Sequence, residues 1–400
     1  MVNRLPTDIV LDIITRLPTE SILDCKLVCR SWRNLVSHHP SFAQMHLARL
    51  HGHDSGKLSF LAVVYKGRTL ENLLHYFEYN ENTDHETTIH NTRRMNSTLP
   101  FPFRFSHFRI MGSFNGLVCL FGWQDNVYFI CNPMTKEYVM FPNYISDKFS
   151  TRGKGFGYLN STNEYKVVEF YEELNFIKAA VYTLGSGKGW RNVGQWDSML
   201  CNVKSSCGAF ANGAIYWMDC KERKLFVFDL VEEKFREHVA LPPHPQLGSH
   251  YTPLCFIGDL GGVLYYYAGT FYNEITNFRS YEIWLLKKKN NIPVMKKQVE
   301  HEPFGWSKFS LPQSKHPFAS TTYPLTFTKS GSVLSYCQYT LDIYNAVAST
   351  SKQLVGFAGT GIILCNIVPH KNTFISLKEL GEEDVKTMES AEIEEAKAVT

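Results

Sequence analysis

The sequence predicts a multidomain protein of the α and β class, with a small N-terminal three-helix unit (residues 1–48), an all-β, propeller-like domain (residues 57–377) and an acidic C-terminal tail (residues 378–400). Apolar residues recur at helical spacing in the first forty positions. A strand-rich unit with one internal spacing then occurs twice. Acidic residues crowd the last stretch of the chain. These three observations set the boundaries.

The composition describes a folded chain. Of the 400 residues, 44% are apolar and 20% are charged, close to the usual values for globular domains. Aromatic residues make up 14%, which favours pleated sheets. A net charge of +3 is low for a nucleic-acid-binding protein, which usually shows a strongly basic face. We therefore expect no nucleic-acid partner.

The sequence also predicts no membrane span, because it lacks a run of about 18 apolar residues. Charged residues from Arg4 to Glu20 interrupt the N-terminal apolar positions, which argues against a secretory signal. The ten cysteines are scattered along the chain. We expect them to be reduced thiols in a protein of the cytoplasm, the nucleus or both.

Three short helices are predicted in the first zone. Pro6 suits a first helical turn, and Asp8 suits the positive end of the helix dipole. Pro18 and Pro40 end the first and third helices, and Thr19 is expected to cap the second. The apolar positions of the three helices are Ile9, Val10, Ile13, Ile14 and Leu17, then Ile22 and Leu23, then Leu27, Val28, Trp32, Leu35 and Val36.

Fewer than fifty residues with so many large apolar groups would be only marginally stable alone. These groups also occupy more than one stripe on each helix. Either the helices pack onto the β domain of their own chain, or they offer an apolar face to another protein. Periodicity does not decide between these interpretations.

Two units of the β zone share one layout. Asn115-Gly116 and Asn212-Gly213 each precede an apolar strand, and Asn132 or Asp229 follows 17 residues after the Asn. Glycine supplies positive φ at the first turn, and the Asn or Asp reverses the chain before a further strand. Weaker copies begin at Gly261-Gly262 and Gly331-Ser332. Units of about 40–50 residues with about four strands predict propeller blades. The alternative is a two-sheet sandwich, and the blade count stays open.

Like charges and few apolar groups predict that the tail is disordered or a frayed helix. The sequence indicates no catalytic residue, metal ligand or cofactor. Cys25 and Cys29 are four apart, but no second close pair completes a zinc site. In Gly185–Gly189, Lys188 is not followed by the Ser or Thr of a phosphate loop.

The helical zone resembles an F-box. Leu5–Pro18 is similar to the opening of that motif, and Leu27–Val36 with Pro40–Phe42 is similar to its close. Thr19-Glu20 stands where many plant members have Val-Lys. The resemblance implies binding to the Skp-type adaptor of a cullin ubiquitin ligase, an acidic surface that Lys26, Arg30 and Arg33 would suit. It places eight residues at or beneath the adaptor interface: Leu5, Pro6, Ile9, Leu17, Pro18, Val28, Cys29 and Trp32.

Residues 100–370 resemble the F-box-associated domain of plants, which is related to kelch-type propellers. The supporting motifs are Gly155-Phe156-Gly157-Tyr158, Asn163–Val168, Gly189-Trp190-Arg191 and Trp306-Ser307-Lys308. A regular double-glycine kelch signature is missing; only Gly261-Gly262 is similar to it.

The two resemblances together predict a non-catalytic substrate-recognition subunit of a Skp–cullin–F-box ubiquitin ligase. Its β domain would recruit an unknown target protein for ubiquitination and degradation. An F-box scaffold or inhibitor outside a ligase is one alternative, and a propeller glycoside hydrolase with two converging carboxylates is another. Segments 80–100, 143–153, 242–253 and 269–280 are the candidate target-binding loops, chosen for length and polarity.

Overall fold

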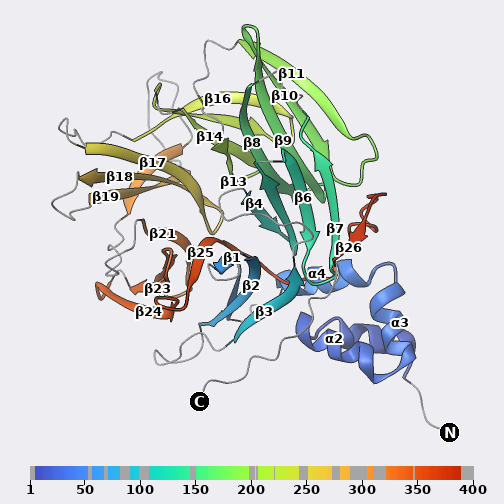
Figure 1. The fold of residues 1–400 in the computed structure, drawn as a ribbon. Helices are drawn as coiled ribbons and strands as arrows, with labels where there is room; N and C mark the ends of the chain where they lie inside the picture. The colour runs from blue at the N-terminus through green and yellow to red at the C-terminus, as the bar shows by residue number, and fades with distance from the viewer. Residues whose placement is uncertain are drawn as a thin grey trace, which may run out of the picture. The chain divides into compact units, whose positions relative to one another are not determined.

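The computed structural model describes four helices followed by six β-sheets, antiparallel apart from one short parallel pair between residues 206–207 and 153–154 (Figure 1). It covers residues 5–52, 56–66, 71–81, 91–98, 108–123, 125–144, 150–197, 203, 206–219, 221–242, 251–272, 280–288, 304–309, 321–345 and 347–388. The chain forms two compact units. Unit 1 holds residues 1–142, 184–187 and 357–400, and unit 2 holds residues 143–183 and 188–356.

The helical zone contains one helix more than the sequence predicted. Its helices are α1 (Thr7–Ile14), α2 (Thr19–Val28), α3 (Arg30–His38) and α4 (Phe42–Gly52). Phe42, which the resemblance placed in the close of the F-box motif, begins α4. Phe42, Ala43, His46 and Leu47 of this helix are all buried, at helical spacing. The buried histidine made the apolar pattern hard to see in the sequence.

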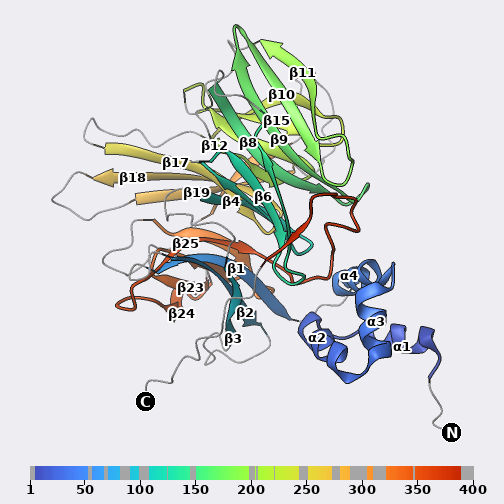
Figure 2. The same ribbon diagram turned by 45° about the vertical axis from the view of Figure 1, so that its right-hand side comes forward.

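Unit 1 also contains two of the sheets. The first has the order β25-β1-β2-β3, so the C-terminal strand β25 pairs antiparallel with β1, and Figures 1 and 2 show the two side by side. The second has the order β26-β7-β6-β5-β4. Both contribute to one apolar core. The strands are β1 (Lys57–Lys66), β2 (Glu71–Asn80), β3 (Asn91–Thr98), β4 (Phe108–Phe114), β5 (Leu117–Gly122), β6 (Val127–Asn132), β7 (Glu137–Pro142), β25 (Ile362–Pro369) and β26 (Lys386–Thr387).

Unit 2 contains the other four sheets, each with four principal strands in meander order. They are β8 (Ser150–Leu159), β9 (Glu164–Glu173), β10 (Phe176–Thr183) and β11 (Trp190–Asp197), joined by β12 (Ser206–Cys207); β13 (Ala209–Ala211), β14 (Ala214–Asp219), β15 (Lys224–Asp229) and β16 (Lys234–Ala240); β17 (Tyr251–Leu260), β18 (Val263–Tyr272), β19 (Ser280–Lys288) and β20 (Phe304–Phe309); and β21 (Tyr323–Phe327), β22 (Val333–Tyr336), β23 (Thr340–Asn345) and β24 (Thr350–Gly356).

The sheets are the blades of a six-bladed β-propeller, so the predicted fold class is confirmed. Six separate sheets of four or five strands exclude the two-sheet sandwich. They also supply the blade count that the sequence left open.

The repeated turns have the predicted chemistry. Asn115 and Gly116 have φ values of 48° and 84°, and Asn212 and Gly213 have 51° and 77°. Two successive positive φ values match the twist of a tight hairpin, which is why Asn-Gly recurs there. At the turn that follows β15, the side chain of Asp229 accepts hydrogen bonds from the backbone N–H groups of Val231 and Glu232, both at 2.8 Å.

The same acceptor turn occurs at two places that the sequence analysis passed over. Asp219 accepts hydrogen bonds from two backbone N–H groups that follow it, and so does Asn345. Four residues after each, Arg223 and Ser349 have positive φ. An Asn or Asp four residues before a left-handed residue is therefore the better signature of these blades.

Three alternate glycines let β8 pack tightly in unit 2. A Cβ atom on Gly153 would lie 2.8 Å from Nε1 of Trp217, and one on Gly155 would lie 2.6 Å from Cγ2 of Ile215. One on Gly157 would lie 2.5 Å from Cδ1 of Leu230. The motif that carried part of the family resemblance is thus a packing device, which lets side chains of the next sheet approach the backbone of β8.

The ordered chain extends beyond the domain boundary predicted at residue 377. Residues 378–388 belong to unit 1: β26 pairs with β7, and Met388 is buried in the core. The carboxylate of Glu382 accepts a hydrogen bond from the N–H of Gly185 at 2.7 Å. The acidic composition of the whole tail gave no indication of these contacts. Residues 389–400 lie outside the described part.

Candidate functional site

The first three helices have an inner face and an outer face. The inner face is buried together with part of α4; the buried apolar side chains are Leu11, Ile14, Ile22, Cys25, Val36, Phe42 and Leu47. The outer face exposes large apolar side chains, which we call the outer patch: Leu5, Ile9, Ile13, Leu23, Leu27 and Val28. Leu27 is 77% exposed and Val28 is 63% exposed. The outer patch therefore stays exposed while other apolar side chains of the same helices are buried.

The break between α2 and α3 sets the position of the most exposed pair. Cys29 is extended, with φ −160° and ψ 166°, and its sulfur accepts a hydrogen bond from the N–H of Trp32 at 3.5 Å. Leu27 and Val28 consequently end α2. The sequence analysis grouped them with the third helix because their spacing to Trp32 fits one continuous helix.

None of the eight residues that the resemblance selected is fully buried. Leu17 and Trp32 are half-buried. The other six are exposed: Leu5, Pro6, Ile9, Pro18, Val28 and Cys29. The residues predicted for the adaptor interface did not include Ile13, Leu23 or Leu27, which the structure exposes. Apolar periodicity gave no means to find them, because it marks apolar positions without showing which face they occupy.

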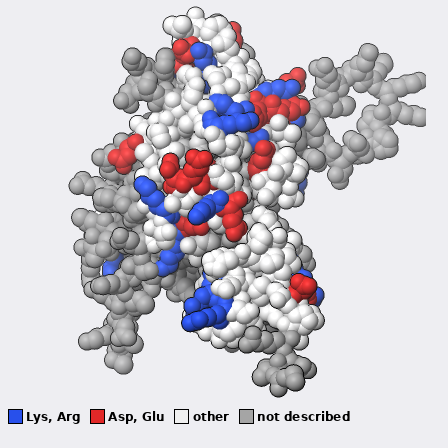
Figure 3. All heavy atoms as spheres, turned by 90° about the vertical axis from the view of Figure 1, so that its right-hand side faces the viewer, with Lys and Arg blue, Asp and Glu red and all other residues white. Residues whose placement is uncertain are grey.

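Some of the basic side chains near the outer patch already make contacts within the chain. Figure 3 turns the helices toward the viewer, and much of their surface carries neither acidic nor basic side chains. Lys26 lies 5.3 Å from the ring centre of Phe374, and burial lowers its pKa. Arg33 donates from Nε to the carbonyl oxygen of Lys26 at 3.0 Å. Of the three cations expected to meet an acidic partner, Lys26 is thus partly committed to contacts within its own chain.

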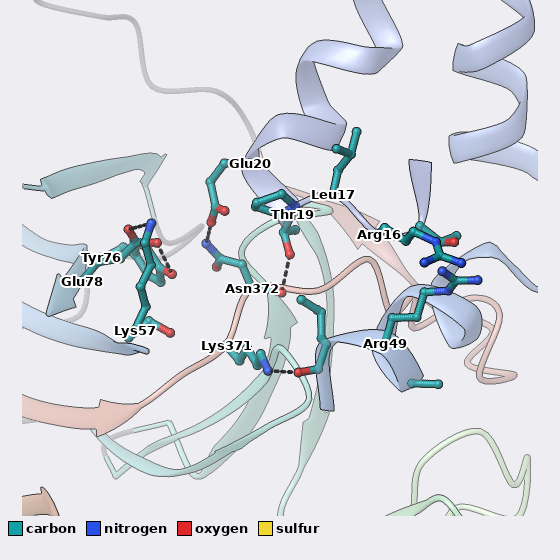
Figure 4. A pocket seen from close by; sticks show the side chains of 15 residues that line it. Arg16, Leu17, Thr19, Glu20, Arg49, Lys57, Tyr76, Glu78, Lys371 and Asn372 are labelled. Atoms are coloured by element: carbon teal, nitrogen blue, oxygen red, sulfur yellow. Dashed lines mark hydrogen bonds and ion pairs between the residues drawn. The ribbon is translucent and has the colours of Figure 1, made fainter. Parts of the chain in front are cut away.

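The chain end from 370 to 388, which we call the C-terminal strap, anchors the inner side of the helices. The hydroxyl of Thr19 donates to the carbonyl oxygen of Asn372 at 2.9 Å, and the side-chain amide of Asn372 donates to Glu20 at 2.8 Å (Figure 4). Thr19 does not cap α2 as expected. Its hydroxyl is used for this contact, and α2 has no side-chain cap.

Aromatic rings add to this contact between the strap and the helices. The Phe374 ring lies 5.9 Å from that of Phe42 and 5.7 Å from that of His46. His46 also contacts the carbonyl oxygen of Leu17 through Nε2 at 3.0 Å. Burial lowers the pKa of His46, which favours the neutral ring. The turn between α1 and α2 is therefore held from inside the unit while its outer side stays open.

A cleft of about 690 Å³ lies between the helices, the first sheet and the strap. Figure 4 shows its side chains coming from all three. Arg16 and Arg49 both pair with Asp12, and Lys57 pairs with Glu78. The charged side chains at the cleft therefore form ion pairs with one another within the chain.

Acid should weaken unit 1 through His370. Burial lowers the pKa of His370 to about 4, partly offset by its hydrogen bond to Asn372. The ring also contacts the hydroxyl of Ser113 at 2.8 Å. An unfolded histidine titrates near pH 6.5. This contribution is therefore complete above pH 6.5 and is lost as the pH falls toward 4.

Urea unfolding at pH 6.5 and at pH 5 measures the effect. We expect a loss of about 2 kcal/mol, since one pKa unit corresponds to about 1.4 kcal/mol. His370→Gln should flatten this slope. An equal slope in wild type and variant would contradict the assignment to His370.

Among the described residues, no group of three or more His, Cys, Asp or Glu side chains is placed to hold a metal ion. No helix in the same residues combines the length and the apolar character that crossing a bilayer requires.

Comparison with known proteins gives a consistent picture. Residues 60–322 match the family model described as the F-box associated beta propeller domain, and residues 2–46 match the F-box-like model. An F-box protein of Arabidopsis thaliana is 27% identical over 315 residues, covering 71% of this chain and 69% of its own length. An F-box/kelch-repeat protein of the same plant is 26% identical over 326 residues, covering 78% and 80%. Among solved structures, the nidogen/laminin complex matches with a TM-score of 0.39 and 13% identity, over 78% of this chain and 98% of the matched chain.

Proposed function

The chain belongs to the plant F-box proteins that carry an F-box associated β-propeller domain, and on that premise we propose that it is the substrate-recognition subunit of a Skp–cullin–F-box ubiquitin ligase. The helices bind the Skp-type adaptor and, through it, the cullin. The propeller recruits a target protein for ubiquitination and degradation in the cytoplasm, the nucleus or both. The receptor performs no bond chemistry; it raises the local concentration of target lysines near the ubiquitin carrier.

The observation that carries this proposal is the outer patch. Soluble proteins rarely leave many large apolar side chains of one small helical unit exposed unless a partner covers them. Here Leu27 and Val28 are exposed although the same helices already have a buried core. These exposures support a division between the two faces: the inner face packs within the chain, and the outer face binds the adaptor.

Replacing Val28 by glutamate should strongly weaken adaptor binding. The substitution places a charge in an apolar interface, and burying an unpaired charge is costly. We expect the Kd for a purified Skp-type adaptor to rise about 100-fold, equivalent to about 2.8 kcal/mol. Isothermal titration calorimetry measures it.

Val231→Glu is the matched control. Val231 is 61% exposed, against 63% for Val28, but lies in a turn of unit 2. Its Kd should stay within a few-fold of wild type. The proposal fails if wild type does not bind the adaptor, or if Val28→Glu binds as tightly as Val231→Glu.

Ubiquitin transfer separates a ligase receptor from an F-box scaffold or inhibitor. Proximity labelling in plant cells with the Val28→Glu receptor should enrich target proteins, because a receptor cut off from the ligase cannot mark them for degradation. A target found in this way should be ubiquitinated by the ligase reconstituted with wild-type receptor. Binding without transfer would favour the scaffold. The described parts of the four candidate target-binding segments are mostly strand: β3 lies within 80–100, and the ends of β8, β17, β18 and β19 lie within the other three. The remaining residues of these segments lie outside the described part, and target binding by them stays a prediction.

A further inference from the structure

The C-terminal strap is bound to the first two sheets over most of its length. The side-chain amide of Asn132 donates to the carbonyl oxygens of Thr373 and Ile375 at 3.1 and 2.7 Å. The hydroxyl of Thr373 donates to the carbonyl oxygen of Asn115 at 2.6 Å, and the carboxylate of Glu137 accepts from the N–H of Leu377 at 2.7 Å. The strap thus runs along the turns and strand ends of the β4–β7 sheet.

The opposite side of the strap contacts the F-box. Asn372 bridges Thr19 and Glu20 in the first turn of α2, and Lys371 donates to the carbonyl oxygen of Leu50 in α4. Phe374 fills the space beside Phe42 and His46. Asn372 and Phe374 are both buried. Side chains of one short segment therefore link three parts of unit 1.

The covalent connection cannot supply this link alone. Helix α4 ends at Gly52 and β1 begins at Lys57. A linker of this length restricts how far apart its ends can lie, since each residue spans at most about 3.6 Å. It leaves rotation about the backbone bonds open. A second attachment, distant in sequence and buried, removes that freedom.

We propose that Asn372 and Phe374 are positioning residues, which lock the F-box to the first two propeller sheets so that the receptor holds its target at a fixed place relative to the ligase. This inference rests on the proposed function. Its physical core, a rigid joint made by the strap, concerns the receptor alone. The strap would then affect where ubiquitin is delivered without touching adaptor or target.

Single-molecule energy transfer tests the joint. One dye is placed at Ser37 on α3 and the other at Met140 on β7, both exposed and both within unit 1, through a non-natural amino acid that leaves the ten cysteines unmodified. Wild type should give one narrow distribution. Asn372→Ala removes the bridge to Glu20 and should broaden it at least two-fold. Phe374→Ala should broaden it further.

The control is Lys378→Ala, an exposed strap position, which should leave the distribution narrow. Adaptor Kd, measured in parallel, should change less than three-fold in Asn372→Ala, whereas a general unfolding of the F-box would weaken it strongly. If Phe374→Ala unfolds the helices, Asn372→Ala decides, because it removes only the side-chain hydrogen bonds of Asn372 to Glu20 and His370 and leaves every residue of the helices unchanged. Distributions as narrow as wild type in both variants would overturn the inference.

Failure of the two proposals can be told apart. Energy transfer is recorded on the receptor alone and again with the Skp-type adaptor bound. A receptor that binds no adaptor but broadens on Asn372→Ala would refute the proposed function and keep the rigid joint. A receptor that binds the adaptor but never broadens would do the reverse.

Discussion

Valine at position 155 is expected to cost unit 2 about 3 kcal/mol or more of its free energy of unfolding. A Cβ atom on Gly155 would lie 2.6 Å from Cγ2 of Ile215, 2.9 Å from its Cδ1 and 3.0 Å from Cζ2 of Trp217. Ile215 and Trp217 are fully buried, so neither can move toward solvent. Overpacking a core usually costs 1–3 kcal/mol, and a branched side chain here meets two rigid neighbours. Urea unfolding followed by tryptophan fluorescence measures the loss.

Two further variants make this prediction specific. Gly187→Val adds the same side chain where a Cβ atom would contact nothing, so it reports only the strain of a positive φ. Ile215→Ala removes the atoms that the new side chain would strike. The double variant Gly155→Val/Ile215→Ala should therefore be more stable than the sum of the two single losses implies. Simple additivity would show that the close approach is not what makes glycine necessary.

Removing one member of the buried ion pair between Lys154 and Glu169 should be at least as damaging. Both side chains are almost completely buried, and Nζ of Lys154 pairs with Oε1 of Glu169. The other carboxylate oxygen accepts from the N–H of Tyr144 at 2.8 Å. Burial lowers the pKa of Lys154, and the charge of Glu169 opposes that shift. Lys154→Met leaves a buried carboxylate without its counter-ion, which typically costs 3–5 kcal/mol.

The double variant separates the value of the pair from the penalty of breaking it. Lys154→Met/Glu169→Gln carries no buried charge, and the amide oxygen of glutamine can still accept from Tyr144. Its free energy of unfolding should lie within about 1–2 kcal/mol of wild type, because neutral replacements of buried pairs are often tolerated. If Lys154→Met alone loses less than about 1 kcal/mol, the pair is not desolvated as the structure indicates.

The sequence predicted the blades because their physics is local. Asn115-Gly116 and Asn212-Gly213 specify tight hairpins within a few residues, and the strands that follow these turns are short apolar runs rich in aromatic residues. The F-box followed from a gapless run of residues around two Leu-Pro steps. What the sequence could not show were contacts between positions far apart, such as Thr19 with Asn372, which are 353 residues apart.

The candidate site was only partly predictable for the same reason. Periodicity marked Ile13, Leu23 and Leu27 as apolar but could not show that they face outward. It also could not distinguish Glu382, which accepts a backbone hydrogen bond, from acidic neighbours that are exposed. Charge counting treats all of them alike, whereas burial and geometry separate them.

The pairing of β25 with β1 has a consequence for synthesis. A ribosome releases the F-box first, but the residues that seat it, Asn372 and Phe374, are added about 350 positions later. At roughly 5–20 residues per second, the helices wait on the order of 20–70 s for them. A chain terminated before β25 would lack the strap that holds the F-box, and its first sheet would lack this strand. Correct positioning of the F-box therefore requires that translation has passed residue 374.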